Sequence, residues 1–348
     1  MPTKRSPKHA GGQTPPHGIR LHEDAHQGYT ASKPSIYFDG RSHPYTEDTG
    51  ATFEVVYPLG GPAERVRTLT VSSVSDGHAG YLASYTVTKL IPEVFPSCLE
   101  AANGDVPDAL SRLFATLAEQ TAQMSSGTTC NVTVFDPAHG KVHIASLGDS
   151  PTLRYRKGPR GTFRLIWKSV DQDCGDPAEI DRMVQVHRLN GDFTADASTV
   201  VFQVMRGDRP TGVWRNRQTQ CMTHSSFGDA LNEYYPNIVN RIPRIYTQDW
   251  STKQRSDVWI QCTDGLLEWL TDSLIGIQPR GDVRVSELAR HLDTCHRHVN
   301  VARSLHELQI ESMLHARVEA HPSRTDSTQA WVESTFDNHL TKVFMWDV

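Results

Sequence analysis

Four short apolar runs, far apart along the chain, are each bordered by an aspartate in a turn: Asp76, Asp149, Asp264 and Asp337. A single aspartate of this kind is an ordinary turn residue, because its side chain bonds the neighbouring backbone. If the strands pair so that their corresponding ends lie together, however, the four carboxylates converge on one rim. Converging negative charges are unfavourable unless cations neutralise them. The pattern therefore predicts a metal site built from distant parts of the chain.

The spacing of apolar residues predicts strands that come in neighbouring antiparallel pairs. Alternating residues separated by turn sequences mark three hairpins, at 53–57 with 66–74, at 128–135 with 142–147, and at 152–156 with 162–167. Helical spacing follows Asp76 as far as Pro92, and it recurs from Pro107 to 117, over 177–186 and within 285–320. Two more strands are expected at 258–262 and 343–346. Residues 205–250 are polar and proline-rich, which indicates a surface insertion or flap.

Composition excludes several classes of protein. The 348 residues include 35 Lys plus Arg and 40 Asp plus Glu, so the chain lacks the basic field of a nucleic-acid-binding protein. No run approaches the roughly 18 apolar residues of a membrane-spanning helix. The six cysteines form no C-x-x-C pair, so we expect them to be reduced, in the cytoplasm or alternatively the nucleus. Residues 1–35, rich in Pro and Gly, predict a flexible arm.

The donor types in the acidic pattern favour particular metals. Carboxylates without a Cys or His cluster at ligand spacing suit hard ions such as Mg²⁺ or Mn²⁺ better than Zn²⁺. Two such ions about 3.5–4 Å apart lower the pKa of a bound water and clamp both oxygens of an in-line displacement at phosphorus. The residues therefore predict hydrolysis of a phosphate ester.

The sequence from Val74 to Gly80, Val-Ser-Asp-Gly-His-Ala-Gly, resembles the signature of metal-dependent serine/threonine protein phosphatases of the type 2C class. Further segments resemble motifs of that family in the same order. They are Ser126–Thr129, Gly148–Ser150, the acidic and helical segment 171–183, Phe227–Asp229, Cys262–Leu266 and Asp337–Thr341. The resemblance spans roughly residues 36–348, and collinear motifs are far more specific than any one of them.

This resemblance implies an α+β fold, in which a central β-sandwich of two antiparallel sheets is flanked by helices. Residues 36–348 would form the phosphatase domain, with additions near 205–224 and 296–330. The resemblance also implies that Asp76 bridges two metal ions and that the Gly77 carbonyl binds one of them. Asp264 and Asp337 would complete the ligand set of the other ion, and Asp149 would help to hold a third ion that binds more weakly.

His78 is implied to be the general acid that protonates the leaving seryl or threonyl oxygen, a task that imidazole suits near neutral pH. The family also has an arginine shortly before a Glu-Asp pair, and this chain offers two candidates. Arg20 precedes Glu23-Asp24, and Arg41 precedes Glu47-Asp48. We choose Arg41 as the phosphate clamp, with Glu47 and Asp48 as metal ligands, because only one hairpin separates that pair from the Asp76 motif.

The predicted activity is hydrolysis of phosphoserine or phosphothreonine on a phosphoprotein by a monomeric, Mg²⁺- or Mn²⁺-dependent enzyme. The absence of a C-x5-R signature indicates that no phosphoenzyme forms. Two alternatives stay open. Pro151, where the family usually has arginine, is compatible with an inactive phosphatase-like binding module. The carboxylate chemistry alone also permits a hydrolase of small phosphate esters.

Overall fold

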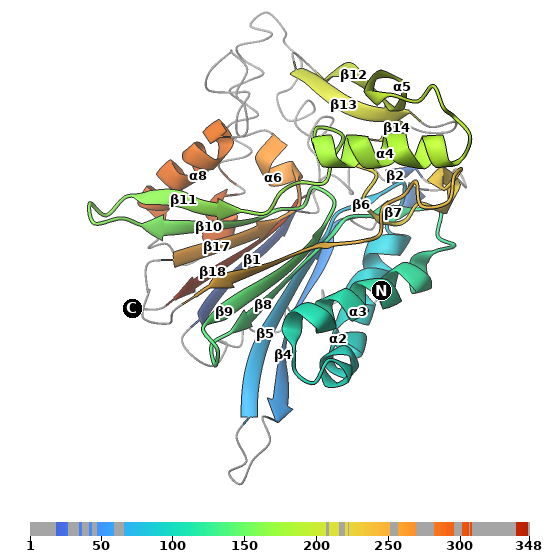
Figure 1. Cartoon of the computed structure of the whole chain (residues 1–348). Helices are drawn as coiled ribbons and strands as arrows, with labels where there is room; N and C mark the ends of the chain where they lie inside the picture. Colours follow the sequence, from blue (N-terminus) through green and yellow to red (C-terminus); the bar gives the residue numbers. More distant parts are fainter. Residues whose placement is uncertain are drawn as a thin grey trace, which may run out of the picture.

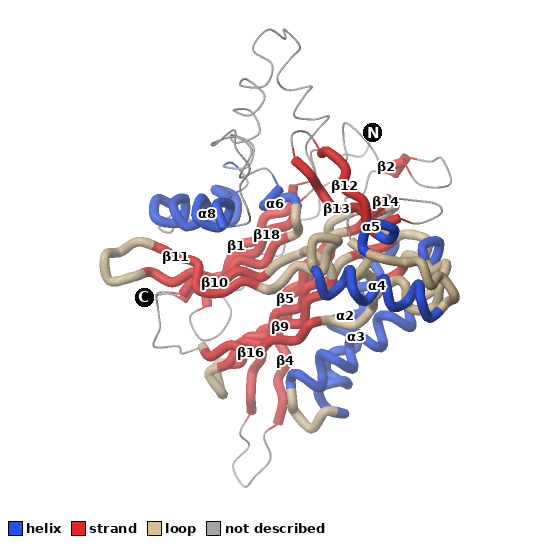
Figure 2. Tube along the Cα trace, turned by 45° about the horizontal axis from the view of Figure 1, so that its top comes forward, coloured by secondary structure: helices blue, strands red, loops and turns tan. Residues whose placement is uncertain are grey.

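Two five-stranded antiparallel sheets pack face to face, and helices cover both outer faces (Figures 1 and 2). The computed structural model describes residues 19–26, 35–36, 42–43, 47–58, 66–206, 209–215, 220–221, 223–250, 257–268, 282–295, 301–305, 307 and 339–346. This arrangement is the predicted α+β sandwich flanked by helices.

The first sheet has the strand order β16-β9-β8-β5-β4, and the second has the order β1-β18-β17-β10-β11. All three predicted hairpins are present, and each pairs in antiparallel register. The strands of the first sheet are β4 (Thr49–Pro58), β5 (Val66–Ser75), β8 (Cys130–Asp136), β9 (Lys141–Leu147) and β16 (Arg244–Asp249). Those of the second are β1 (Ile19–His26), β10 (Thr152–Lys157), β11 (Phe163–Lys168), β17 (Asp257–Cys262) and β18 (His339–Trp346).

Aromatic side chains fill part of the space between the two sheets. Phe135 from the first sheet lies with its ring centroid 4.7 Å from that of Phe344 and 6.1 Å from that of Trp259, both in the second sheet. Trp250, just after β16, completes the cluster, with its ring centroid 5.6 Å from that of Phe135. Tilted and edge-to-face pairs at these distances contribute attraction beyond their buried area.

Helices α2 (Leu82–Ala101) and α3 (Val106–Thr121) cover the outer face of the first sheet. Asp105 caps α3 by accepting a hydrogen bond from the backbone N–H of Asp108. The sequence predicted that the helix after Asp76 would end at Pro92, and this prediction is wrong. Helix α2 continues through Pro92 and Pro96, because its later turns bury Phe95 and other apolar residues against the core.

The outer face of the second sheet packs against α6 (Gly265–Glu268), α8 (Asp282–Cys295) and the helical residues 301–305. Buried leucines on these helices contact β17 and β18 through Ile260 and Val343. The predicted addition at 296–330 lies mostly outside the described residues.

A third layer sits at one end of the sandwich (Figure 1). It contains α4 (Pro177–Leu189), α5 (Ala197–Val200) and a three-stranded sheet, β12 (Val201–Arg206), β13 (Arg209–Arg215) and β14 (Gln220–Cys221). The segment 205–250, which is hard to interpret from sequence, also supplies β15 (Phe227–Gly228), the short 3-10 helix η1 (Ala230–Asn232) and β16.

Two small sheets complete the described elements. One joins β15, β7 (Gly127–Thr128) and β6 (Gly77–His78), and the other pairs β2 (Ser35–Ile36) with β3 (Ser42–His43). Within the segment 1–35, for which the sequence predicts a flexible arm, residues 19–26 differ from the prediction. They form β1, whose backbone pairs with all eight residues of β18. No helix in the described ranges is long and apolar enough to cross a membrane.

Candidate active site

The Asp76 turn connects β5 to β6 and is held by hydrogen bonds with Thr128 and Thr129. The Asp76 carbonyl accepts hydrogen bonds from the Thr129 N–H and the Thr128 hydroxyl, each at 2.9 Å. The Asp76 N–H in turn donates to the Thr129 hydroxyl at 3.2 Å. These three bonds fix the end of β5, so the position of the Asp76 side chain is set by the sheet.

Glu47, just before β4, packs directly against this turn. Its carboxylate accepts a hydrogen bond of 2.7 Å from the Gly80 N–H, and its carbonyl accepts one of 2.5 Å from the Ser84 hydroxyl. A Cβ on Gly77 would lie only 2.5 Å from the Glu47 carbonyl oxygen, so the close approach requires glycine at position 77. Burial raises the pKa of Glu47, and the Gly80 N–H and the charge of His78 offset only part of this effect.

Asp48 ties the start of β4 to the end of β17. Its side chain accepts a hydrogen bond of 2.8 Å from the hydroxyl of Thr263, which immediately precedes Asp264. The Thr263 N–H donates to the Leu340 carbonyl at 3.1 Å, which adds the start of β18 to the same assembly. Strand ends from both sheets therefore meet here.

Asp149 and Asp264 lie in strongly acidic surroundings. Burial raises the pKa of Asp149 well above its usual value, and the charges of Asp264, Asp173 and Asp171 raise it further, in that order. Lys168 offsets part of this charge by donating to the Asp171 carboxylate at 2.6 Å. The other Asp171 oxygen is buried and has no hydrogen-bond partner among the residues that the structure describes.

His78 forms an ion pair with a buried carboxylate at the same rim. Its Nε2 lies 2.8 Å from Oδ2 of Asp229. The His78 side chain is 27% exposed, whereas that of Asp229 is 3% exposed. Burial opposes protonation of the ring, but Asp229, followed by Glu47 and Asp264, outweighs this effect and raises the pKa of His78.

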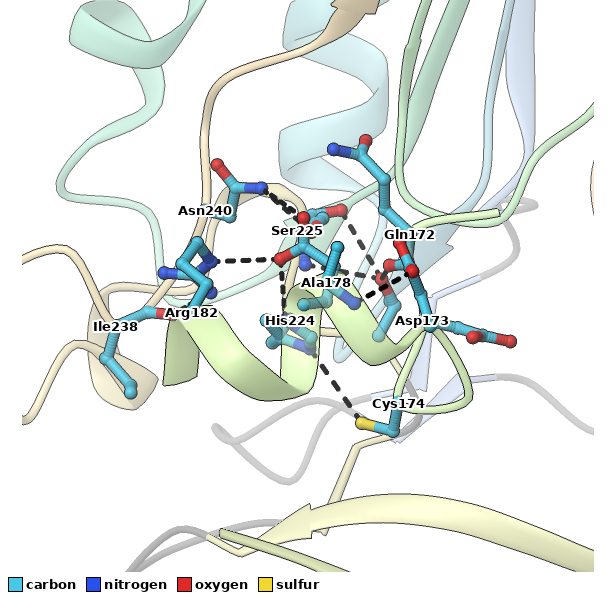
Figure 3. A network of polar contacts seen from close by, with 12 residues as sticks. Gln172, Asp173, Cys174, Ala178, Arg182, His224, Ser225, Ile238 and Asn240 are labelled. Atoms are coloured by element: carbon cyan, nitrogen blue, oxygen red, sulfur yellow. Dashed lines mark hydrogen bonds and ion pairs between the residues drawn. The ribbon is translucent and has the colours of Figure 1, made fainter. Parts of the chain in front are cut away.

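A polar network anchors the segment that carries Asp171 and Asp173 to helix α4. Figure 3 shows His224 and Asn240 beside that helix and Arg182 on it. Each of the three donates to the buried carboxylate of Glu179, which also belongs to the helix, at 3.0, 3.1 and 2.9 Å respectively. The other nitrogen of His224 lies 3.8 Å from the Cys174 sulfur. The network therefore fixes the acidic loop relative to the third layer.

No protein-family model and no curated protein sequence matches this chain. Among solved structures, a C. elegans sex-determining protein matches with a TM-score of 0.54 at 17% identity, over 95% of this chain and 65% of that one. A serine-threonine phosphatase 2C from Toxoplasma gondii matches with a TM-score of 0.52, also at 17% identity, over 94% of this chain and 99% of that one. The chain has the phosphatase 2C fold. Identities this low establish the fold alone.

Within the phosphatase 2C fold, the described part of the chain brings together most of the residues predicted for the site. The first acidic pair, Glu47-Asp48, lies against the Asp76 turn, whereas the rejected Glu23-Asp24 falls within β1, in register with Lys342 and Thr341 of β18. Arg41 and Asp337 lie outside the described residues. The predicted residues gathered here are Glu47, Asp48, Asp76, Gly77, His78, Asp149 and Asp264.

Three further acidic residues at the site received no role from the sequence. Asp229 and Asp171 lie in segments that resemble phosphatase 2C motifs, but only the structure pairs one with His78 and places the other beside Asp149. Asp173 lies in the segment 171–183 that resembles a family motif, but the sequence did not single it out, and its relevance comes from its charge beside Asp149.

The donor set matches a hard divalent cation in its chemistry. The rim offers carboxylates together with the Gly77 carbonyl. A bound cation would relieve the repulsion between Asp149 and the neighbouring carboxylates. Among the described residues, no group of three or more His, Cys, Asp and Glu side chains is placed so that it could hold an ion. Asp337, the remaining predicted ligand, is not among them.

The Glu179 network predicts a loss of stability in acid. The pKa of Glu179 is lowered from 4.5 to about 2: burial acts in the opposite direction, but the hydrogen bonds and charges of His224 and Arg182 outweigh it. A lowered folded-state pKa stabilises the protein above pH 4.5, and this contribution disappears as the pH falls toward 2. We expect Glu179→Gln to lower the unfolding free energy at pH 7 by up to about 3 kcal/mol.

Urea denaturation at several pH values measures this effect. The difference between wild type and Glu179→Gln should shrink between pH 4.5 and 2. Glu307→Gln, which removes a carboxylate paired with Arg303 at 3.2 Å on the surface, is the control and should change stability by less than about 1 kcal/mol. A difference for Glu179→Gln that is independent of pH would show that its charge is not the cause.

Proposed function

We propose that this chain hydrolyses phosphoserine and phosphothreonine on proteins, using water activated by Mg²⁺ or Mn²⁺. The observation that carries the proposal is the collection of acidic residues from four separate strand ends around His78, at one rim of a phosphatase 2C fold. The protein substrate class and the monomeric state are part of the same proposal.

The side chains divide into ligands and groups that act on the substrate. Glu47, Asp76 and the Gly77 carbonyl would hold one cation, and Asp76, Asp264 and Asp337 would hold the other. Asp149, with Asp264 beside it, would hold a weaker third. Asp48, expected from the sequence to be a ligand, accepts a hydrogen bond from the Thr263 hydroxyl and would instead support the site through Thr263. The cations supply a water of lowered pKa and positive charge to stabilise the phosphoryl oxygens.

Two side chains would handle the substrate itself. His78 donates a proton to the seryl or threonyl oxygen as that oxygen leaves phosphorus, and Asp229 favours the protonated ring from which the proton comes. Arg41 would bind the phosphate through its planar fork of donors.

Water, rather than a cysteine, is the nucleophile in this proposal. Four cysteines in the described part of the chain, Cys98, Cys130, Cys174 and Cys262, are all buried. Burial raises the pKa of Cys130 to about 12, which leaves its thiol protonated at neutral pH. These four thiols are therefore poor candidates for a phosphocysteine intermediate.

Phosphate release from a phosphothreonine peptide, a phosphoserine peptide and a nucleoside monophosphate, with and without Mn²⁺, tests the proposal. We expect Mn²⁺-dependent hydrolysis of the peptides and little release from the nucleotide. Faster hydrolysis of the nucleotide would instead indicate a hydrolase of small phosphate esters. Binding of Mn²⁺ without release from any substrate would indicate a phosphatase-like binding module.

A further inference from the structure

The small sheet β15-β7-β6 places His78 and Asp229 against each other. Gly127 on the central strand pairs with His78 on one side and with Gly228 on the other. Asp229 follows Gly228 directly, so both side chains of the ion pair converge over Gly127. The register of three short strands, rather than a flexible loop, therefore sets the geometry of the pair.

Gly127 leaves the space that the pair occupies. A Cβ at this position would lie 2.1 Å from Nε2 of His78 and 2.4 Å from Oδ2 of Asp229. Both distances are far below any real contact of a Cβ atom, so a larger residue would displace one partner or the other. The hydrogen bond between His78 and Asp229 therefore requires glycine at position 127.

The Asp229 carboxylate is surrounded by donors. The Ser226 hydroxyl donates to Oδ2, and the Asn232 amide donates to Oδ1 at 3.2 Å. The Asp229 backbone is in the left-handed region, with φ of 56°, and its N–H donates to the Ser126 carbonyl at 3.1 Å. These contacts fix both the position of the carboxylate and its ionised form.

An ionised carboxylate only accepts hydrogen bonds, so the nitrogen of His78 that faces it must carry a proton. That nitrogen is Nε2, and the carboxylate holding it is buried. Within the described part of the chain, Nδ1 of His78 makes no hydrogen bond. One ring nitrogen is therefore committed to the protein, and the other is available to a substrate.

We propose that Asp229 is a positioning residue that commits Nε2 of His78 to the protein and leaves Nδ1 as the atom that transfers the proton. This inference rests on the proposed function. As the bond from phosphorus to the leaving oxygen breaks and the bond to the attacking water oxygen forms, the Nδ1 proton passes to the leaving oxygen and the attacking water gives up one proton to solvent. The ring is left neutral with its proton on Nε2, where Asp229 holds it, and Nδ1 is protonated again from solvent.

Leaving groups of increasing basicity give the kinetic test, because a general acid matters most when the departing oxygen is most basic. The substrates are 4-nitrophenyl phosphate, phenyl phosphate and a phosphothreonine peptide. Asp229→Ala should reduce turnover of the peptide about 100-fold and change turnover of 4-nitrophenyl phosphate little. His78→Asn should show the same pattern, and the double variant should be no slower than His78→Asn alone.

Two further variants separate positioning from folding. Asp229→Asn keeps an oxygen that can accept from Nε2, so it should retain more peptide turnover than Asp229→Ala. Asp192→Asn is the matched control, because Asp192 pairs with His187 at 3.3 Å outside the site, and it should leave every substrate unaffected. Equal losses on all three substrates for Asp229→Ala, or additive losses in the double variant, would overturn the proposal.

Nitrogen-15 NMR of the histidine rings provides a readout that does not depend on turnover. The neutral His78 ring, assigned from its absence in His78→Asn, should carry its proton on Nε2 in the wild type and lose this preference in Asp229→Ala. A neutral ring protonated on Nδ1 would refute the role of Asp229. If no phosphate ester is hydrolysed at all, the proposed function fails, and the NMR result still decides whether Asp229 sets the tautomer.

Discussion

Replacing Asp76 with asparagine should reduce Mn²⁺-dependent phosphatase turnover by about 100-fold or more, since even the loss of a group that only supports a metal ligand commonly costs 10–100-fold. The substitution preserves shape and removes one negative charge. The Asp76 backbone makes three hydrogen bonds with Thr128 and Thr129, so the turn should keep its conformation. The loss should therefore come from weaker cation binding rather than from misfolding.

Titration calorimetry with Mn²⁺ and thermal unfolding with and without the ion check this result. A bound ligand stabilises the folded state by an amount that grows with its concentration relative to its dissociation constant. The Mn²⁺-induced rise in melting temperature should be large for the wild type and small for Asp76→Asn.

Asp108→Asn is the matched control, because Asp108 pairs with Arg112 on the surface of α3, with 46% of its side chain exposed. It should bind Mn²⁺ as the wild type does. If Asp76→Asn also keeps full Mn²⁺ affinity and turnover, the rim around Asp76 is not the catalytic centre.

The hairpins of the fold could be predicted because they depend on local sequence. Alternating apolar residues on either side of a short turn determine which faces are buried and which strands are neighbours. The pair 53–57 with 66–74 became β4 and β5, and the pair 128–135 with 142–147 became β8 and β9.

The elements that could not be predicted depend on distant parts of the chain. Helix α2 passes through Pro92 and Pro96 because residues far along the chain bury its later turns, which local helix-breaking rules do not include. Strand β1 lies in a polar, proline-rich region and forms only because β18, some 300 positions later, offers an edge for backbone pairing.

The candidate site shows the same division. Motif residues such as Asp76 and Asp264 could be selected because turns and strand ends are visible in the sequence. The partner of His78 could not be selected, because Asp229 lies 151 residues away and reaches His78 only through the small sheet built on Gly127. Side-chain pairing across a sheet is a property of register, which the sequence of either strand alone does not specify.

Phe135→Ala should lower the unfolding free energy by about 3–5 kcal/mol, the usual range for removing a buried aromatic ring. Phe135 is 1% exposed, and from the first sheet it contacts the rings of Trp259 and Phe344 in the second. Its removal leaves a cavity that neither sheet can fill without shifting the other. Phe135→Leu, which keeps much of the volume, should lose only about 1 kcal/mol.

Urea denaturation measures these losses, with Phe193→Ala as the control. Phe193 is 82% exposed, so its truncation should change stability by no more than about 0.5 kcal/mol. A loss below about 1 kcal/mol for Phe135→Ala would show that the two sheets do not depend on this cluster.

The packing also matters for the site, because Asp76 follows β5 of the first sheet and Asp264 follows β17 of the second. Since the distance between these carboxylates is set by how the sheets pack, Phe135→Ala should also weaken Mn²⁺ binding, although Phe135 is not part of the site.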